Sequence, residues 1–157
     1  MPMTVFPEPT RSNQHMIHLE TQARLNPTLP ISPSALLPLL QSILACLDLQ
    51  DRDLFLQCVD DGKIADLNES FLGCTGPTNI LSFPASPEEN KVVLGELALS
   101  IDTLTREIHL YGQDPLEHLV RLLAHGILHL AGYDHGETMY SLTEMVVAQV
   151  CHTADQD

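Results

Sequence analysis

The segment from His125 to His135 constrains the fold of this chain more than any other stretch. Its sequence is HGILHLAGYDH, and it ends an apolar, helically patterned run that starts at Pro115. With Asp114 as N-cap and a proline in the first turn, we predict a helix over 115–131 that Gly132 stops. His125 and His129, four residues apart, then project from the same helix face. Gly132 allows a left-handed turn, so the chain can swing back and bring His135 toward the other two rings.

Three neutral imidazoles at this spacing predict a site for one zinc ion. Imidazole nitrogens bind zinc at about 2.0–2.1 Å, and three such ligands leave the fourth tetrahedral position open to water, as in catalytic sites. A zinc ion in that setting lowers the pKa of bound water toward about 7 and polarises a phosphoryl oxygen. The all-imidazole set favours zinc over copper or nickel without excluding them. Two histidines four apart are often ordinary polar or core residues, but the third histidine and the glycine favour the metal site.

The same spacing occurs in a class of zinc peptidases with the pattern H-E-x-x-H-x-x-G-x-x-H. Those enzymes need the glutamate after the first histidine as general base. This chain has Gly126 there, which has no side chain to exchange a proton. The sequence therefore predicts the metal ligands of such a hydrolase without its peptidase base, unless a glutamate from elsewhere serves.

The rest of the chain predicts one α/β or α+β domain over residues 1–157, a small mixed sheet covered by helices, with residues 1–14 as a flexible tail. A turn is expected at Asp60–Gly62. Ser32 is the expected N-cap of the first helix. The predicted strands are 16–19, 53–59, 79–83 and 92–100, and the predicted helices are 34–47, 63–72, 102–111, 115–131 and 137–151.

The charge balance limits how the chain could bind polyanions. It has 21 acidic and 7 basic residues, a formal net charge of −14. That argues against passive adhesion to nucleic acid or an anionic membrane, and it predicts weak, strongly salt-dependent RNA binding unless a partner helps. The four cysteines form no CxxC pair, and the sequence contains no signal peptide or apolar run of about 18 residues, so we expect a cytoplasmic protein.

With these motifs in view, the chain resembles the YbeY family of bacterial endoribonucleases and rRNA maturation factors. The resemblance covers residues 62–135, and its motifs are HGILHLAGYDH, PTNILSFP at 77–84, LGELALS at 94–100 and, more weakly, Leu67-Asn68. It implies a small α/β fold with one zinc ion on His125, His129 and His135. It also implies cleavage of single-stranded rRNA, in 3′-end maturation of the small-subunit rRNA and in ribosome quality control, with the ribosome or its assembly proteins as partners.

One position departs from that pattern, because Leu72 stands where the family has an arginine in the active-site cleft. Arg121, one helical turn before His125, is a candidate to supply the missing cation. Asp134 is either an acceptor that orients an imidazole or a turn residue. Thr78 and Ser82 are candidates to line the substrate groove. His118, on the same helix face as His125, either borders the cleft or lies at the surface, and we expect the surface position.

Three functions follow from these patterns. The first is the RNA hydrolase. The second is a metallopeptidase-like hydrolase, suggested by the shared histidine spacing, and the third is a non-catalytic ribosome-assembly factor stabilised by zinc. The oligomeric state does not follow from the sequence.

Overall fold

The computed structural model describes residues 16–21 and 31–155, so the predicted tail of residues 1–14 lies outside the described ranges. Four strands and five helices follow one another in these ranges. They are β1 (Ile17–Thr21), α1 (Pro33–Cys46), β2 (Asp53–Val59), α2 (Asp61–Leu72), β3 (Ile80–Pro84), β4 (Val93–Ser100), α3 (Ile101–Tyr111), α4 (Pro115–Leu130) and α5 (Glu137–Asp155).

The strands form one mixed sheet in the order β1-β2-β4-β3. β1, β2 and β4 run parallel, whereas β3 pairs antiparallel with β4. The parallel pairs are joined by crossovers through α1 and α2, since parallel neighbours cannot be linked by a tight hairpin. The predicted α/β class with a small mixed sheet is confirmed.

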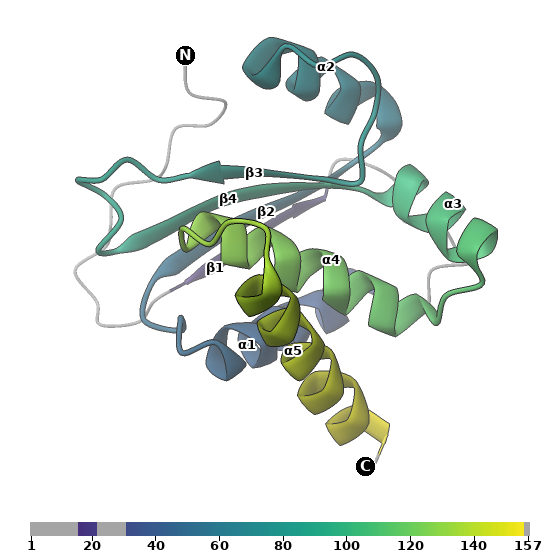
Figure 1. Cartoon of the computed structure of the whole chain (residues 1–157). Coiled ribbons are helices and arrows are strands. Elements are labelled where there is room, and N and C mark those ends of the chain that lie inside the picture. The colour runs from purple at the N-terminus through teal and green to yellow at the C-terminus, as the bar shows by residue number, and fades with distance from the viewer. Residues whose placement is uncertain (1–15, 22–30, 156–157) are drawn as a thin grey trace.

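Helices cover the two faces of the sheet unequally, as Figure 1 shows: α1, α4 and α5 lie on one side and α2 on the other. The larger hydrophobic core fills the three-helix side, where Leu97, Val120 and Ile127 are fully buried. The smaller core lies under α2 and includes Ile64 and Leu67. Helix α4 lies directly on the sheet at the centre of the larger core, and it carries two of the three histidines.

Local capping explains why most helices begin and end where the sequence predicts. The Ser32 hydroxyl accepts a hydrogen bond from the Ala35 amide at 3.3 Å, and the Asp114 carboxylate accepts one from the Glu117 amide at 2.9 Å. Each bond satisfies one of the amides that a helix N-terminus leaves unpaired. Gly112 ends α3 in the left-handed conformation, with φ of 60°.

Three predicted boundaries are wrong by two residues or more, and the first is the end of β1, which reaches Thr21 rather than residue 19. Asp60–Gly62 is not a turn before a helix: α2 already starts at Asp61, because the Asp60 carboxylate accepts a hydrogen bond from the Lys63 amide at 2.8 Å and so acts as N-cap. Helix α5 continues to Asp155, four residues past the predicted end, since no glycine or proline follows Cys151 to stop it. Across the described ranges, every helix is too short or too polar to cross a lipid bilayer.

Candidate metal centre

Helix α4 lies unusually close to the sheet at the point where it carries the histidines. The Ser82 hydroxyl on β3 donates a hydrogen bond to the Gly126 carbonyl at 3.1 Å. A Cβ atom built on Gly126 would lie 2.9 Å from the side chain of Leu97 and 3.0 Å from that of Ile80. Gly126 therefore faces the sheet, and its missing side chain lets α4 pack against β3 and β4.

This packing bears on the peptidase alternative. A glutamate at position 126 would start inside the contact with Leu97 and Ile80, both hydrophobic. The side chains of Leu97 and Ile80, or α4 itself, would have to shift to make room for it. The glycine thus suits the close packing of α4 on the sheet, and the side chain that serves the zinc peptidases as general base would here point at hydrophobic residues of the sheet.

The turn after α4 returns the chain toward the first two histidines, as the sequence predicts. Gly132 has a φ of 97°, which side chains other than glycine rarely adopt, and its amide donates to the His129 carbonyl at 3.0 Å. The Tyr133 amide donates to the Leu128 carbonyl at the same distance, which fixes the turn. His135 follows two residues later and its ring centroid lies 4.7 Å from that of His129.

The three imidazoles converge on one point and could hold a metal ion. One ring nitrogen from each of His125, His129 and His135 lies within 4.8 Å of the others. The Nε2 atoms of His125 and His129 are 3.1 Å apart. Nitrogens bound tetrahedrally at zinc distances are about 3.4 Å apart, so the rings need only small shifts to share an ion. The donor set and its spacing fit a divalent cation.

The surroundings of His125 favour the neutral ring that a metal needs. Burial lowers the pKa of His125, and the charges of His129 and His135 lower it further. A neutral imidazole keeps a nitrogen lone pair available for a cation, whereas a protonated one does not.

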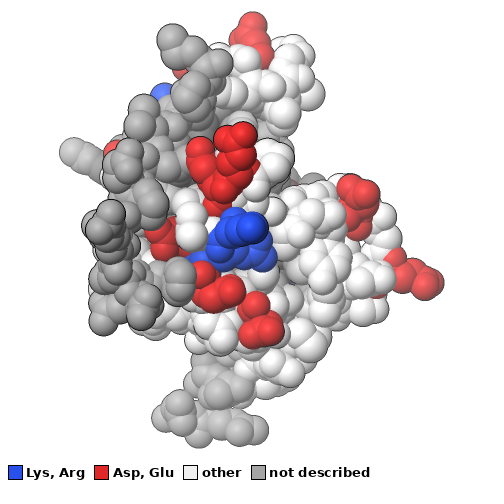
Figure 2. Space-filling model, turned by 90° about the vertical axis from the view of Figure 1, so that its left-hand side faces the viewer, with Lys and Arg blue, Asp and Glu red and all other residues white. Residues whose placement is uncertain are grey.

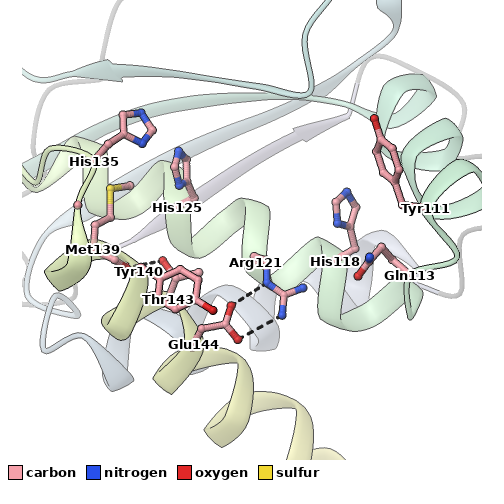
Figure 3. Close-up of a pocket in the computed structure, with 11 residues that line it drawn as sticks. Tyr111, Gln113, His118, Arg121, His125, His135, Met139, Tyr140, Thr143 and Glu144 are labelled. Carbon is pink, nitrogen blue, oxygen red and sulfur yellow. Dashed lines mark hydrogen bonds and ion pairs between the residues drawn. The ribbon is translucent and has the colours of Figure 1, made fainter.

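Two grooves meet at the histidines. The larger, of about 710 Å³, lies between α3, α4 and α5 and includes His125 and His135 (Figure 3). The smaller, of about 350 Å³, follows β3 and includes His125 and His129. The larger groove is otherwise lined by Tyr111, Gln113, His118, Arg121, Gly136, Met139, Tyr140, Thr143 and Glu144. An extended substrate could therefore pass the metal centre from one groove to the other.

Arg121 lies in the larger groove, one helical turn from His125, but it is already paired. Its Nε atom donates to the Glu144 carboxylate of α5 at 3.0 Å, and its Nη2 atom donates to the same group at 3.4 Å. Both side chains remain about one-third exposed. The guanidinium is thus near the histidines, with its charge balanced by a carboxylate in the same groove.

The other candidate residues are Ser82, Thr78 and Asp134, and only Ser82 lines one of the two grooves. Ser82 lines the smaller groove together with Leu72, so the family's arginine position faces this groove with an apolar side chain. Thr78 is half-buried in the loop before β3 and lines neither groove. Asp134 is exposed, and within the described residues no hydrogen bond joins it to the three imidazoles. The functional roles of these residues remain predictions.

His118 lines the larger groove, which fits the alternative that it borders the cleft rather than the expected surface position. Only 13% of its side chain is exposed, and its Nε2 atom lies 3.2 Å from the Glu107 carboxylate of α3. The side-chain amide of Asn79, the residue just before β3, donates a hydrogen bond to the same carboxylate at 3.2 Å. This cluster joins β3, α3 and α4 beside the larger groove. It escapes sequence reasoning because its three members are far apart in the chain and have no common motif.

Comparisons with known proteins agree on one family. Residues 31–153 match the family model described as endoribonuclease YbeY. The endoribonuclease YbeY of Oleidesulfovibrio alaskensis is 42% identical over 84% of this chain and 90% of its own length. That of Nitratidesulfovibrio vulgaris is 46% identical over 61% of this chain and 70% of its own length.

A solved structure shows the same fold at lower identity. The solution structure of a Thermotoga maritima protein matches with a TM-score of 0.65 and 24% identity, over 90% of this chain and 93% of that one. The match to the family model and the identity to the Oleidesulfovibrio protein extend well beyond the histidine motif. This chain belongs to the endoribonuclease YbeY family.

Proposed function

We propose that this chain is a metal-dependent endoribonuclease and that His125, His129 and His135 hold one zinc ion at its active site. The convergence of three imidazole nitrogens within 4.8 Å, where two grooves meet, is the observation that carries the proposal. The relatives named endoribonuclease supply the class of substrate. An all-nitrogen set of three ligands favours zinc among the divalent ions.

The residues around the centre have distinct parts in this proposal. When bound, zinc polarises a phosphoryl oxygen and lowers the pKa of a water molecule. Arg121 donates hydrogen bonds to the phosphate next to the scissile bond, replacing the cation that Leu72 does not supply. Ser82 holds α4 on β3 through its bond to the Gly126 carbonyl, and it lines the path of the RNA in the smaller groove.

We further propose that the natural substrate is single-stranded rRNA, at the 3′ end of the small-subunit rRNA, and that the protein works with ribosomal assembly proteins. Membership of the YbeY family supports this role. A host that lacks its own YbeY protein and expresses this chain tests it. Wild type should restore mature 3′ ends and His125→Ala should not. Normal ends with a folded His125→Ala protein would favour the non-catalytic assembly factor.

The direct test combines metal content with activity on purified protein. We expect wild type to carry about one zinc per chain and to cleave a single-stranded oligoribonucleotide. His129→Ala should lose most of both. His109→Ala is the matched control, because His109 is an exposed histidine on α3 that lines neither groove.

The outcomes separate the three functions. A metal-free wild-type protein, or full cleavage by His129→Ala, overturns the proposal. Cleavage of casein rather than RNA by the metal-loaded protein would establish the peptidase instead.

A further inference from the structure

The larger groove differs in character from a phosphate-binding surface. Arg121 is the one Lys or Arg among the described residues that line it, and Glu144 balances its charge. Its other lining residues include Gln113, Met139 and Thr143, all uncharged. Away from the metal ligands His125 and His135, the groove is therefore close to neutral, in a chain with a net charge of −14. Long-range attraction for a polyanion is weak under these conditions.

On the face seen in Figure 2, the basic side chains of the described residues do not gather into a larger alternative surface. On the side of the molecule seen in Figure 2, one small group of Lys and Arg side chains is bordered by Asp and Glu. Arg106 on α3 is likewise paired, with the Asp61 carboxylate at 2.6 Å. Apart from the bound metal and Arg121, RNA affinity at this groove must therefore come from contacts other than phosphate neutralisation.

Two aromatic side chains in the groove can supply such contacts. Tyr111 ends α3 and is 63% exposed, and Tyr140 on α5 is 69% exposed. Both line the groove, and Figure 3 shows Tyr140 near the histidine end and Tyr111 at the far end, beyond His118. Both rings are thus accessible to a ligand in the groove, and an aromatic ring in such a position can stack on the face of a base. A volume of about 710 Å³ lies within the usual range for small-molecule sites, about 300–1,000 Å³.

From this geometry we infer that the larger groove binds unpaired nucleotides through their bases, which stack on Tyr140 and Tyr111. The inference rests on the proposed endoribonuclease function and adds to it how the substrate is held. Stacking is tolerant of sequence, because every base has an aromatic face. It requires bases that are not paired in a duplex, so the two tyrosines select single-stranded RNA. The RNA chain then runs from Tyr111 past Arg121 to the histidines.

The test measures binding and cleavage of a fluorescent single-stranded oligoribonucleotide by the metal-loaded full chain. Tyr111→Ala and Tyr140→Ala should each raise Kd and KM about five- to hundredfold, the usual loss for one stacked base, with kcat little changed. Tyr111→Phe and Tyr140→Phe should stay within about twofold of wild type, since the ring remains. Leu110→Ala is the matched control, because Leu110 is 74% exposed beside Tyr111 but does not line the groove.

The salt dependence of RNA affinity is a second measurement, and a purely structural role of the two tyrosines would not change it. With at most two phosphates contacted, one by Arg121 and one by the bound metal, the slope of log affinity against log salt should be no steeper than about −1.4, because each contact with a single strand contributes about −0.7. This is the opposite of the strong salt dependence that the net charge alone predicts. A slope of about −2 or steeper would mean that phosphates hold the RNA and would overturn the inference.

The failure of this inference is distinct from that of the proposed function. RNA cleavage by wild type with unchanged Kd and KM in both alanine variants overturns the stacking sites alone. A metal-loaded wild type that neither binds nor cleaves RNA overturns the endoribonuclease proposal and the stacking sites with it.

Discussion

At the scale of single residues, the pair of Arg121 and Glu144 decides how much positive charge reaches the substrate. Arg121→Ala should lower kcat/KM on RNA about tenfold, the loss of roughly one charge-assisted hydrogen bond. Glu144→Gln should raise kcat/KM about threefold, because the carboxylate of Glu144 now competes with phosphate for the guanidinium. Steady-state kinetics on a single-stranded oligoribonucleotide measures both.

Removing any acidic residue makes the chain less negative, so the Glu144 prediction needs a control for charge. Asp66→Asn changes the net charge equally on an exposed position of α2. It should leave kcat/KM nearly unchanged. If Asp66→Asn and Glu144→Gln gave the same gain, or if the gain persisted in the Arg121→Ala background, the pair would have no specific effect.

Gly126 is a second residue whose identity follows from its surroundings. Gly126→Val places an isopropyl group, a Cβ with two methyl groups, against Leu97 and Ile80. We expect a loss of about 2 kcal/mol in the free energy of unfolding, typical of overpacking, together with weaker metal binding as α4 moves from the sheet. Urea denaturation and zinc titration measure the two effects.

Gly62→Ala is the matched control for Gly126→Val, since it is also a helical glycine but its Cβ would meet only the Asp60 carboxylate, at 3.6 Å. It should be neutral or stabilise the protein by up to about 1 kcal/mol, because alanine is the better helix former. A Gly126→Val protein as stable as wild type would show that α4 has room to spare.

At the scale of secondary-structure elements, α2 is attached to the rest of the fold by a charged contact as well as by its small core. The Asp61 carboxylate accepts hydrogen bonds from Ser100, Thr103 and Arg106, at 2.7, 2.6 and 2.6 Å. Burial raises the pKa of Asp61, but these three hydrogen bonds and the charge of Arg106 outweigh it and hold the pKa below its usual range. The ionised carboxylate therefore joins the start of α2 to the start of α3.

Asp61→Asn should lower the free energy of unfolding by about 1–2 kcal/mol at pH 7, since amide oxygens accept such bonds more weakly than a carboxylate. A depressed pKa stabilises the fold above the pKa of the unfolded state, and this contribution is lost as the pH falls through the folded-state pKa. The difference between wild type and variant should therefore shrink below about pH 4. Urea denaturation from pH 3 to pH 7 measures it. Asp66→Asn on the same helix should have little effect at any pH, and an Asp61→Asn deficit that persisted at pH 3 would contradict the argument.

The contrast between α4 and α2 shows what the sequence can predict. Local signals, such as the Asp114 cap and Gly132, predict α4 and the convergence of its histidines, because each signal acts within a few residues. The predicted start of α2 is wrong because Asp60-Asp61-Gly62 resembles a turn. Asp60 acts as the N-cap only because a helix follows it. The partners of His118 and Arg121 come from other helices. Such contacts depend on how helices pack, which no single segment encodes.

At the scale of the whole molecule, the metal centre lies at the edge of the core rather than within it. His125, His129 and His135 come from one helix and its following turn, and none is among the buried core residues. A metal that joins neighbouring residues of one segment closes only a short loop, so it constrains the unfolded chain little. The large core between α1, α4, α5 and the sheet holds the fold without it. This arrangement differs from small zinc domains, which unfold when the metal leaves.

We therefore predict that removal of the metal weakens the fold but does not abolish it. Metal that binds the folded state alone, at a hundred times its Kd, adds about 2.7 kcal/mol, which for a chain of this length raises Tm by roughly 5–10 °C. Chelation should lower Tm by that amount, leave the far-ultraviolet circular dichroism unchanged and preserve one cooperative transition. His135→Ala should start at the lower Tm and lose its response to chelator, whereas His109→Ala should respond like wild type. A chelated wild-type protein that was unfolded at 25 °C would mean that the ion holds together more of the molecule than the segment that binds it.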